Sequence, residues 1–371
     1  MKHLDLHILQ SVPVTCLNRD DLGSPKTAFF GGVQRARVSS QSWKRAIREY
    51  AHEISPYFEG KRSRLIVEPL KEELIKLGNN EQQSLKWAKE IAGSLATLDS
   101  ENEYKVKTIY FTSPAEIASL AKEYDSISKE KGDIPSDSKK YKEKAKARTK
   151  AAAKNLNSNI YKDAADLALF GRMVASDHSL TIEGAAMFNH PISTHKVDNE
   201  LDFFAAVDEW QKGEDSGAGM TGTLEFNSSV YYRFAALNLN LLADKEHLAC
   251  LTPDERKEVV STFIQATLEA VPGMTSSNSG RKNSMNGYTR PSYVLGIVRE
   301  KGHPIQFVNA FEEPLWAGAG RGIMKASIEK LKEEEKQQNK TWHLERFQVG
   351  RAVMPDKNID EFIKEMVKHV D

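Results

Sequence analysis

The chain has 371 residues with 52 basic and 52 acidic side chains, so its formal net charge is zero. That balance argues against a simple basic nucleic-acid binder but leaves room for a local basic stripe. Cys16 and Cys250 stand far apart, which disfavours a disulfide framework or a cysteine zinc site and fits a reducing compartment. We expect no membrane span and no export signal, because no apolar run is long enough and Asp5 interrupts the N-terminal stretch.

The first sixty residues predict a strand, a loop and a helix. The strand is expected at 4–12, where "LDLHILQSV" alternates. A loop punctuated by Gly and Pro follows in "NRDDLGSPKTAFFGG". The helix is expected in "SSQSWKRAIREYAHEI", with Ser39 or Ser40 as its cap and Trp43 and Ile47 on its buried face.

Residues 61–160 predict a mostly helical block inserted between two pieces of another domain. Capping residues and helical spacing indicate four helices there, at 68–78, 81–95, 113–124 and 139–154.

The remainder predicts a sheet with one further helix. Strands are expected at 166–176, 230–242 and 292–300, and a helix at 252–271 capped by Thr252. A second insertion at 199–228 is rich in Gly and is expected to have irregular backbone. Without the insertions the order is βαββαβ, so the fold class is α+β with the ferredoxin-like plan of RRM-like domains.

One segment combines many cations with no acid: residues 31–48 read "GGVQRARVSSQSWKRAIR". A helix start with hydroxyls and free N–H groups suits phosphate oxygens, and cations on the side away from Trp43 add charge. The alternative is a solvated basic face. The candidate phosphate contacts are Ser39, Ser40, Gln41, Lys44, Arg45 and Arg48.

A second basic pattern lies in the helix expected at 139–154. Its lysines recur every four residues, and like charges at that spacing disfavour a helix by ~0.2–0.5 kcal/mol per pair. Binding to an anionic partner would explain why these lysines are present despite that repulsion. The alternative is that the helix only makes the surface more soluble. These residues, here called the lysine ladder, are Lys142, Lys146, Lys150 and Lys154.

Catalytic signatures are sparse. Asp20 and Asp21 can assist phosphodiester cleavage by proton transfer or through a metal, but a turn or a pairing with Arg19 explains them more simply. His190 and His195 match no metal motif, and "WAGAGRG" lacks the GK[ST] of a phosphate loop. We therefore predict no catalytic residue, no metal and no cofactor.

Long stretches of the chain resemble the CasC family, the backbone subunit of the type I-E CRISPR Cascade complex in the RAMP superfamily. The stretches occur in the family's order, and they are "CLNRDDLGSPKTAFFGGVQRARVSSQSWKRAIR", "LALFGRM", "ISTHKVDNELDFFAAVD", "GTLEFNSSVYYRFA" and "NAFEEPLW". The resemblance implies a hand-shaped protein with a ferredoxin-like palm, a helical fingers insertion and a thumb insertion. The corresponding divisions are palm at 1–60, 161–198 and 229–371, fingers at 61–160 and thumb at 199–228.

The resemblance also implies a function. Family members are non-catalytic and cytoplasmic, polymerise head to tail along the guide crRNA, and assemble with other Cascade subunits to bind target DNA. By position, the guide-binding residues implied for this chain are Arg19, Lys26, Ser39, Ser40, Gln41, Lys44, Arg45, Arg48 and Arg172, together with the apolar wedge residues Met173, Phe204 and Val207. The lysine ladder corresponds to basic fingers residues that meet target DNA.

Alternatives remain open from the sequence. Phe204 can instead belong to the core face of a short helix with Leu201. The chain can be an RNA-cleaving backbone subunit that uses Asp20 or Asp21, or a stand-alone binder of single-stranded RNA.

Overall fold

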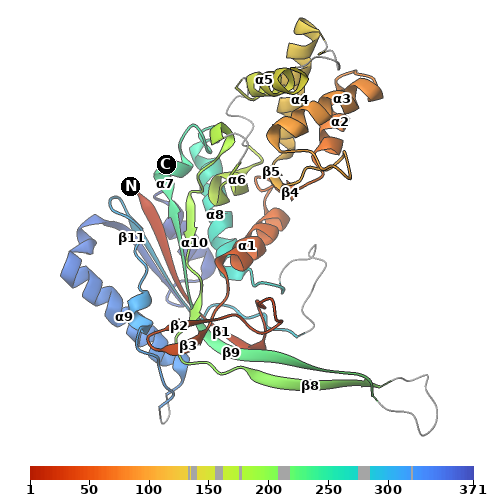
Figure 1. The fold of residues 1–371 in the computed structure, drawn as a ribbon. Coiled ribbons are helices and arrows are strands. Elements are labelled where there is room, and N and C mark those ends of the chain that lie inside the picture. The colour runs from red at the N-terminus through yellow and green to blue at the C-terminus, as the bar shows by residue number, and fades with distance from the viewer. Residues whose placement is uncertain are drawn as a thin grey trace. The chain divides into compact units, whose positions relative to one another are not determined.

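The computed structural model describes residues 1–132, 134, 140–154, 162–174, 178–207, 218–274, 285–318 and 321–371. The chain forms two compact units (Figure 1). The first comprises Met1–Glu53, Met187–Asn238 and Val260–Val370, and the second comprises Ile54–Ala186 and Leu239–Val259 with Asp371. No helix in these described ranges is both long and apolar enough to cross a membrane.

The first unit contains the sheet and the helices that cover it. Its elements, some of which extend a few residues beyond the unit, are β1 His3–Thr15, β2 Thr27–Phe30, β3 Val33–Ala36, α1 Ser40–Ile54, β6 Ala186–Phe188, β7 Ile192–Ser193, β8 Glu200–Val207, β9 Ala218–Asn238, α8 Pro253–Glu269, β10 Tyr293–Arg299, α9 Ile323–Trp342, β11 Gln348–Met354 and α10 Ile359–Val367.

The strand order of the sheet is β11-β10-β1-β9-β6, with β7 and β8 also paired to β9. Helix α1 follows β1 and helix α8 follows β9, so β10-β1-β9-β6 with these helices has the βαββαβ order predicted from the sequence. Its second strand is β6, however, and not the stretch 166–176 that was predicted to fill this place. The edge strand β11 and helix α10 were not predicted. The mixed α+β class is therefore confirmed, with one additional strand at the edge.

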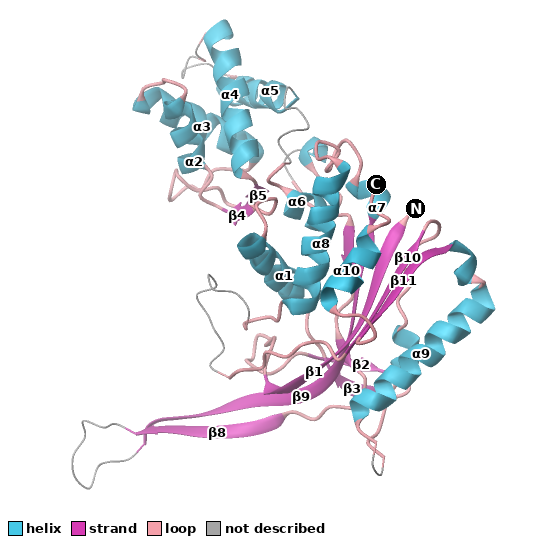
Figure 2. Cartoon of the chain, turned by 180° about the vertical axis from the view of Figure 1, so that it is seen from behind, coloured by secondary structure: helices cyan, strands magenta, loops and turns pink. Residues whose placement is uncertain are grey.

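Helices cover both faces of this sheet (Figure 2). On one face Ile8 lies with Trp43 and Ile47 of α1, and on the other Leu331 of α9 joins a cluster with Leu295. The strand β1, which was predicted at 4–12, is consequently buried on both faces along most of its length.

On the face of the sheet that α9 covers, polar side chains of β1 contact buried partners. Asp5 pairs with Arg299 at 2.7 Å, and His7 Nδ1 lies 3.0 Å from the Tyr232 hydroxyl while its ring stacks on Phe307. Burial raises the pKa of the Asp5 carboxyl to about 7 and holds the pKa of His7 well below its ordinary value.

The strand β9 is long because it serves two pairings. Its second half, Asn227–Asn238, pairs with β1, and its first half pairs with β8 to form a hairpin (Figure 1). The described part of the glycine-rich stretch at 199–228 is thus regular strand, not irregular backbone. Gly222 fits this arrangement because a Cβ there would lie 2.6 Å from the Phe204 ring.

The second unit is mainly helical. A core cluster joins α2, α3, α4 and α5 and includes Leu70, Trp87, Ile117, Tyr124 and Ala152. All four helices predicted at 61–160 are confirmed. The elements of this unit are β4 Lys61–Ser63, α2 Val67–Lys76, α3 Glu81–Leu95, β5 Tyr110–Thr112, α4 Pro114–Lys131, α5 Tyr141–Lys154, α6 Ala165–Phe170 and α7 Leu239–Leu242.

Two predicted strands were wrong in whole or part. The stretch 166–176 begins in helix α6, which ends at Phe170 and is followed by Gly171 with a φ of 74°. A short apolar run does not distinguish a buried strand from a buried helix, which explains the error. The strand predicted at 230–242 stops at Asn238, because its partner in β1 there is His3, the first residue of that strand, and helix α7 follows.

Candidate nucleic-acid interface

The basic segment at 31–48 forms a hairpin followed by helix α1. Gly31 and Gly32 lie at the turn between β2 and β3 with φ of 59° and 76°. A Cβ on Gly31 would lie 1.6 Å from the Glu312 carbonyl oxygen. The glycine pair is therefore explained by the turn and by close packing, and it does not itself indicate a phosphate site.

The cations of this segment divide into internal and outward groups. Arg35 is fully buried, and its guanidinium donates to the carbonyl oxygens of Phe311 at 2.8 Å and Ser193 at 2.9 Å. Arg37 lies nearer the surface and donates from Nε to the Thr27 carbonyl oxygen at 3.1 Å. Arg35 thus holds the hairpin in place, and the charge available to a ligand comes from the other cations.

The start of α1 differs from the sequence prediction in one respect. Its backbone N–H groups are engaged: Ser39 donates to Asn18 Oδ1 and Ser40 to His190 Nδ1, both at 2.9 Å, and Ser42 to Ser39 Oγ at 3.3 Å. Ser39 is the side-chain cap. Since these N–H groups have protein partners, they are not available as the backbone donors to phosphate that the sequence predicted.

Four side chains from separate segments converge beside this helix start. Burial first, and then the positive charges of Arg37, Lys44 and Lys26, hold the pKa of the His190 imidazole below its ordinary value. The ammonium of Lys44 also lies 5.4 Å from the centroid of the Phe188 ring. We call these residues the α1 cluster, and its members are Lys26, Arg37, Lys44 and His190.

Helix α1 itself is anchored by a buried cation. The Arg233 guanidinium stacks 3.6 Å from the Trp43 ring centroid and donates to Gln10 and to the Thr267 carbonyl oxygen. Burial lowers the pKa of Arg233 to about 9. Trp43 was predicted as a core residue, but the sequence offered no signal that an arginine beneath it would fix the helix.

The other predicted residues of the first unit vary in exposure. Gln41 is exposed, and Arg45 is exposed but pairs with Glu49 at 2.7 Å. Arg48 is half-buried one turn further along α1. Arg19 donates to the carbonyl oxygens of Gly23 and Glu225, so it ties its loop to β9.

The β8–β9 hairpin presents several exposed apolar side chains. Phe203 is 69% exposed, Leu201 72% and Met220 61%, and Phe204 lies half-exposed opposite Gly222. The alternative helix with Phe204 in its core is therefore wrong, because Phe204 lies in a strand. Val207 ends β8, and its side chain lies outside the described part of the structure.

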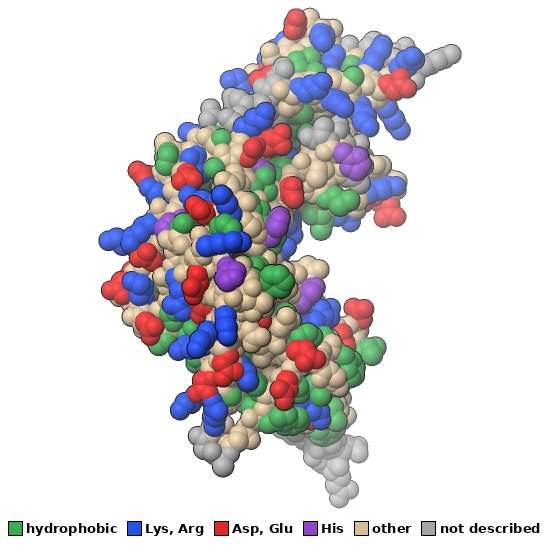
Figure 3. Space-filling model, turned by 90° about the vertical axis from the view of Figure 1, so that its left-hand side faces the viewer, with side chains coloured by type: hydrophobic (Ala, Val, Ile, Leu, Met, Phe, Trp, Pro, Cys, Tyr) green, Lys and Arg blue, Asp and Glu red, His purple; other side chains and the backbone are tan. Residues whose placement is uncertain are grey.

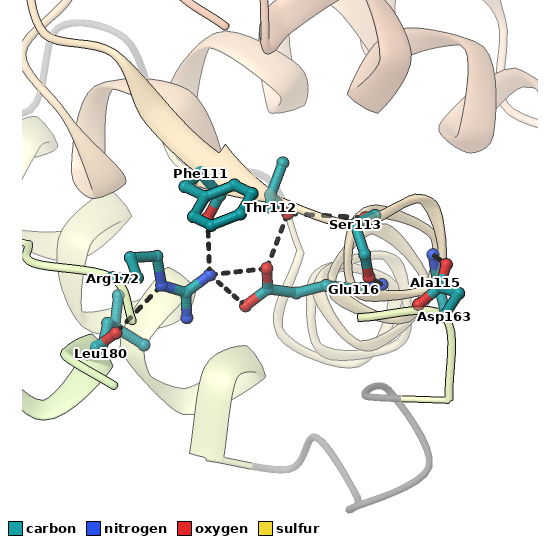
Figure 4. Close-up of polar contacts among 8 residues, drawn as sticks. All are labelled: Phe111, Thr112, Ser113, Ala115, Glu116, Asp163, Arg172 and Leu180. Atoms are coloured by element: carbon teal, nitrogen blue, oxygen red, sulfur yellow. Dashed lines mark hydrogen bonds and ion pairs between the residues drawn. The ribbon is translucent and has the colours of Figure 1, made fainter. Parts of the chain in front are cut away.

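Arg172 occupies a place unlike the one predicted. Its side chain is 3% exposed and pairs with Glu116 at 2.6 Å, and it also donates to the carbonyl oxygens of Phe111 and Leu180 (Figure 4). We correct the prediction that it contacts RNA, because this network leaves no guanidinium surface for a phosphate. The adjacent Met173 is 83% exposed, in the second unit.

The lysine ladder lies on α5 with all four side chains exposed. Ala145, Thr149 and Ala152 form the buried side of this helix. Lysine and arginine side chains predominate over the helical end at the top of Figure 3. Three of the four ladder lysines, Lys146, Lys150 and Lys154, also line a hollow that Ser94 of α3 borders.

The two adjacent aspartates lie in an exposed turn. Asp20 Oδ1 accepts from the N–H groups of Leu22 and Ser24, each at 2.9 Å, which is an Asx-type turn. In the described ranges of the chain, no group of three His, Cys, Asp or Glu side chains is arranged to hold a metal ion.

Comparison with known proteins places this geometry in context. A model of the CT1975-like protein family matches residues 4–369. A solved chain titled "CRISPR RNA-guided surveillance complex, pre-nicking" matches at 27% identity with a TM-score of 0.75, over 98% of this chain and 99% of that chain. Another, titled "CRISPR RNA-guided surveillance complex", matches at 24% identity with a TM-score of 0.64 over the same shares. No curated protein matches the chain.

Proposed function

The chain belongs to the CT1975-like protein family, and from this premise we propose that it is a component of a CRISPR RNA-guided surveillance complex. The observation that carries the proposal is the match over 98% of the chain to a solved chain of such a complex, at a TM-score of 0.75. A match of that extent concerns the whole chain rather than one shared domain.

Within the complex we assign the chain the role of a non-catalytic backbone subunit of the type I-E Cascade kind. Copies would associate head to tail along the crRNA, because heterologous contacts that do not close generate a helical filament. The divisions predicted from the sequence, with palm at 1–60, 161–198 and 229–371, fingers at 61–160 and thumb at 199–228, remain part of this proposal. Its partners are the crRNA, target DNA and other Cascade subunits, in the cytoplasm.

The α1 cluster is suited to hold the guide. A guide RNA changes with every spacer, so its holder must contact phosphate and sugar and leave base edges alone. Lys26 and Lys44 supply charge, and the exposed Gln41 supplies hydrogen bonds to the same backbone. Base pairing then supplies the sequence specificity.

The β8–β9 hairpin is suited to separate bases. Exposed Phe203 and Leu201 and the half-exposed Phe204 give it apolar surface without a protein partner in the described chain. Apolar side chains placed between base steps unstack them, and stacking on an aromatic ring tolerates any base. We assign Phe204 and Val207 to a wedge on this hairpin, as the family resemblance implies. The resemblance also implies a wedge role for Met173, which lies in the second unit and not on the hairpin.

The rival enzymatic function has little support from the turn at Asp20. The Asp20 carboxylate already accepts two backbone N–H groups, which accounts for its presence. The second rival function is that of a stand-alone RNA binder. Such a protein would bind RNA without forming filaments of several copies, which distinguishes it from a backbone subunit.

Two measurements test the proposal. The tagged chain, co-expressed with its partner subunits and a CRISPR array, should co-purify with crRNAs of many unrelated sequences. Sedimentation of the isolated chain should show assemblies that grow with the length of added RNA. Recovery of a single RNA species, or one chain per RNA at every length, would contradict a backbone role.

A further inference from the structure

His190 is an exposed histidine held in one orientation by helix α1. Its Nδ1 lies 2.9 Å from the Ser40 backbone nitrogen, which donates a hydrogen bond to it. A backbone N–H is always a donor, so Nδ1 must carry a lone pair. The proton of the neutral ring therefore resides on Nε2, and the tautomer is fixed by the start of the helix.

Three cations surround this ring. Lys26 precedes β2, Arg37 follows β3 and Lys44 belongs to α1, and the positive charge of each disfavours protonation of His190. Protonation would also set an Nδ1–H against the Ser40 N–H. At neutral pH the ring is thus an uncharged donor, and its Nε2 has no hydrogen-bond partner within the described part of the chain.

We propose that His190 is an additional ligand of the RNA backbone, whose Nε2–H donates a hydrogen bond to a non-bridging phosphate oxygen drawn in by Lys26, Arg37 and Lys44. This inference rests on the proposed function. The lysines attract a phosphate as point charges, while the imidazole, which Ser40 holds in one orientation, is the donor that fixes where the phosphate sits. His190 thereby sets the register of the RNA on α1.

Asparagine at this position separates the two roles of the ring. In His190→Asn, Oδ1 takes the place of Nδ1 and can accept from Ser40, but no donor reaches as far as Nε2. Thermal unfolding should therefore remain close to wild type, whereas His190→Ala should lose both the helix contact and the RNA contact. Full-length wild type and variants are titrated with fluorescent single-stranded poly(U) RNA near pH 7.5, over a range of salt concentrations.

We expect His190→Asn to weaken poly(U) binding by about 10-fold, the value of a hydrogen bond to a charged group. Because a neutral ring releases no counterion, the slope of log affinity against log salt should match wild type. Lys44→Ala is the calibrating variant, and its slope should fall by about 1.

Two results for His190→Asn would overturn the inference. One is wild-type affinity, and the other is a slope reduced as much as that of Lys44→Ala, which would make His190 a charge contact. If Lys44→Ala binds normally as well, the proposed RNA surface itself is wrong. A normal His190→Asn beside a weakened Lys44→Ala refutes only the role of His190.

Discussion

The α1 cluster and the lysine ladder are both basic, but they hold their charges differently. In the cluster, Lys44 lies over the Phe188 ring, Arg37 donates to a backbone carbonyl and His190 is oriented by Ser40. In the ladder, four exposed lysines project from α5, whose buried side is formed by Ala145, Thr149 and Ala152.

This difference teaches how each surface can act. Groups whose orientation is fixed before binding lose little entropy when a ligand arrives, so they can impose a defined geometry on it. Flexible exposed lysines act mainly through a field that salt screens within about 10 Å at 0.1 M. We infer that the cluster suits a permanently bound guide, and the ladder suits capture of a DNA that must come and go.

The largest predicted effect concerns the buried pair of Arg172 and Glu116, which we expect to contact neither RNA nor DNA. Glu116→Gln removes the carboxylate that pairs with the buried Arg172, which should lower the free energy of unfolding of the second unit by about 3–5 kcal/mol. Urea denaturation followed by circular dichroism measures it. The double variant Glu116→Gln with Arg172→Met should recover much of the loss and bind RNA normally. If the folded double variant binds RNA more weakly than wild type, Arg172 contributes to RNA binding and our correction of its role is wrong.

Charge reversal of the lysine ladder tests the division between the two surfaces. Replacing Lys142, Lys146, Lys150 and Lys154 by Glu keeps good helix formers in α5. Duplex DNA capture by the assembled complex should fall by at least about 100-fold at low salt, because some four phosphate contacts become repulsive. Guide RNA content per complex, measured on the same preparation, should stay constant.

A matched control comes from α9. Lys332, Lys336 and Lys340 are also exposed and spaced by four, and their reversal to Glu should leave DNA capture nearly unchanged. If guide RNA content falls together with DNA capture in the ladder variant, the ladder contributes to RNA binding or to assembly of the complex. The proposed division of roles between the two basic surfaces would then be wrong.

Lys44→Ala with Arg45→Ala should weaken RNA binding by a similar factor for unrelated sequences. The log–log salt slope should fall by about 1 for each lost phosphate contact. Arg45 already pairs with Glu49, so Lys44→Ala alone should account for most of the change. Filter binding with several unrelated RNAs measures both quantities, and a loss confined to one sequence would contradict a grip on the backbone.

The sequence predicted the parts of this molecule that local patterns determine. The helices at 61–160 and the strands β1 and β10 follow from capping residues and apolar periodicity, whereas the second strand of the ferredoxin-like order was predicted at the wrong place. Helix α6 was missed because its apolar run fits a buried strand equally well. The exposed side chains of the ladder were also predictable, since four-residue spacing places them on one side of a helix.

What the sequence could not predict are contacts between distant segments. Arg35, Arg172 and Arg233 look alike as surface cations until the fold buries each one beside its carbonyl or carboxylate partners. His190 lies 150 residues from Ser40 along the chain, so only the structure reveals their hydrogen bond. Local composition indicates that a segment is basic, and tertiary structure decides which of its charges a ligand can reach.

The smallest predicted effect is that of Asp20→Asn with Asp21→Asn. Asparagine keeps the side-chain oxygen that accepts from Leu22 and Ser24, so the turn should persist and stability should change by no more than about 0.5 kcal/mol. With complementary RNA bound and a divalent metal present, wild type and variant complexes should both leave the RNA intact. Metal-dependent cutting by wild type that the variant lacks would instead identify an RNA-cleaving subunit. In that case the turn that contains Asp20 and Asp21 would be the active site of the chain, and the α1 cluster and the lysine ladder would serve only to bind nucleic acid.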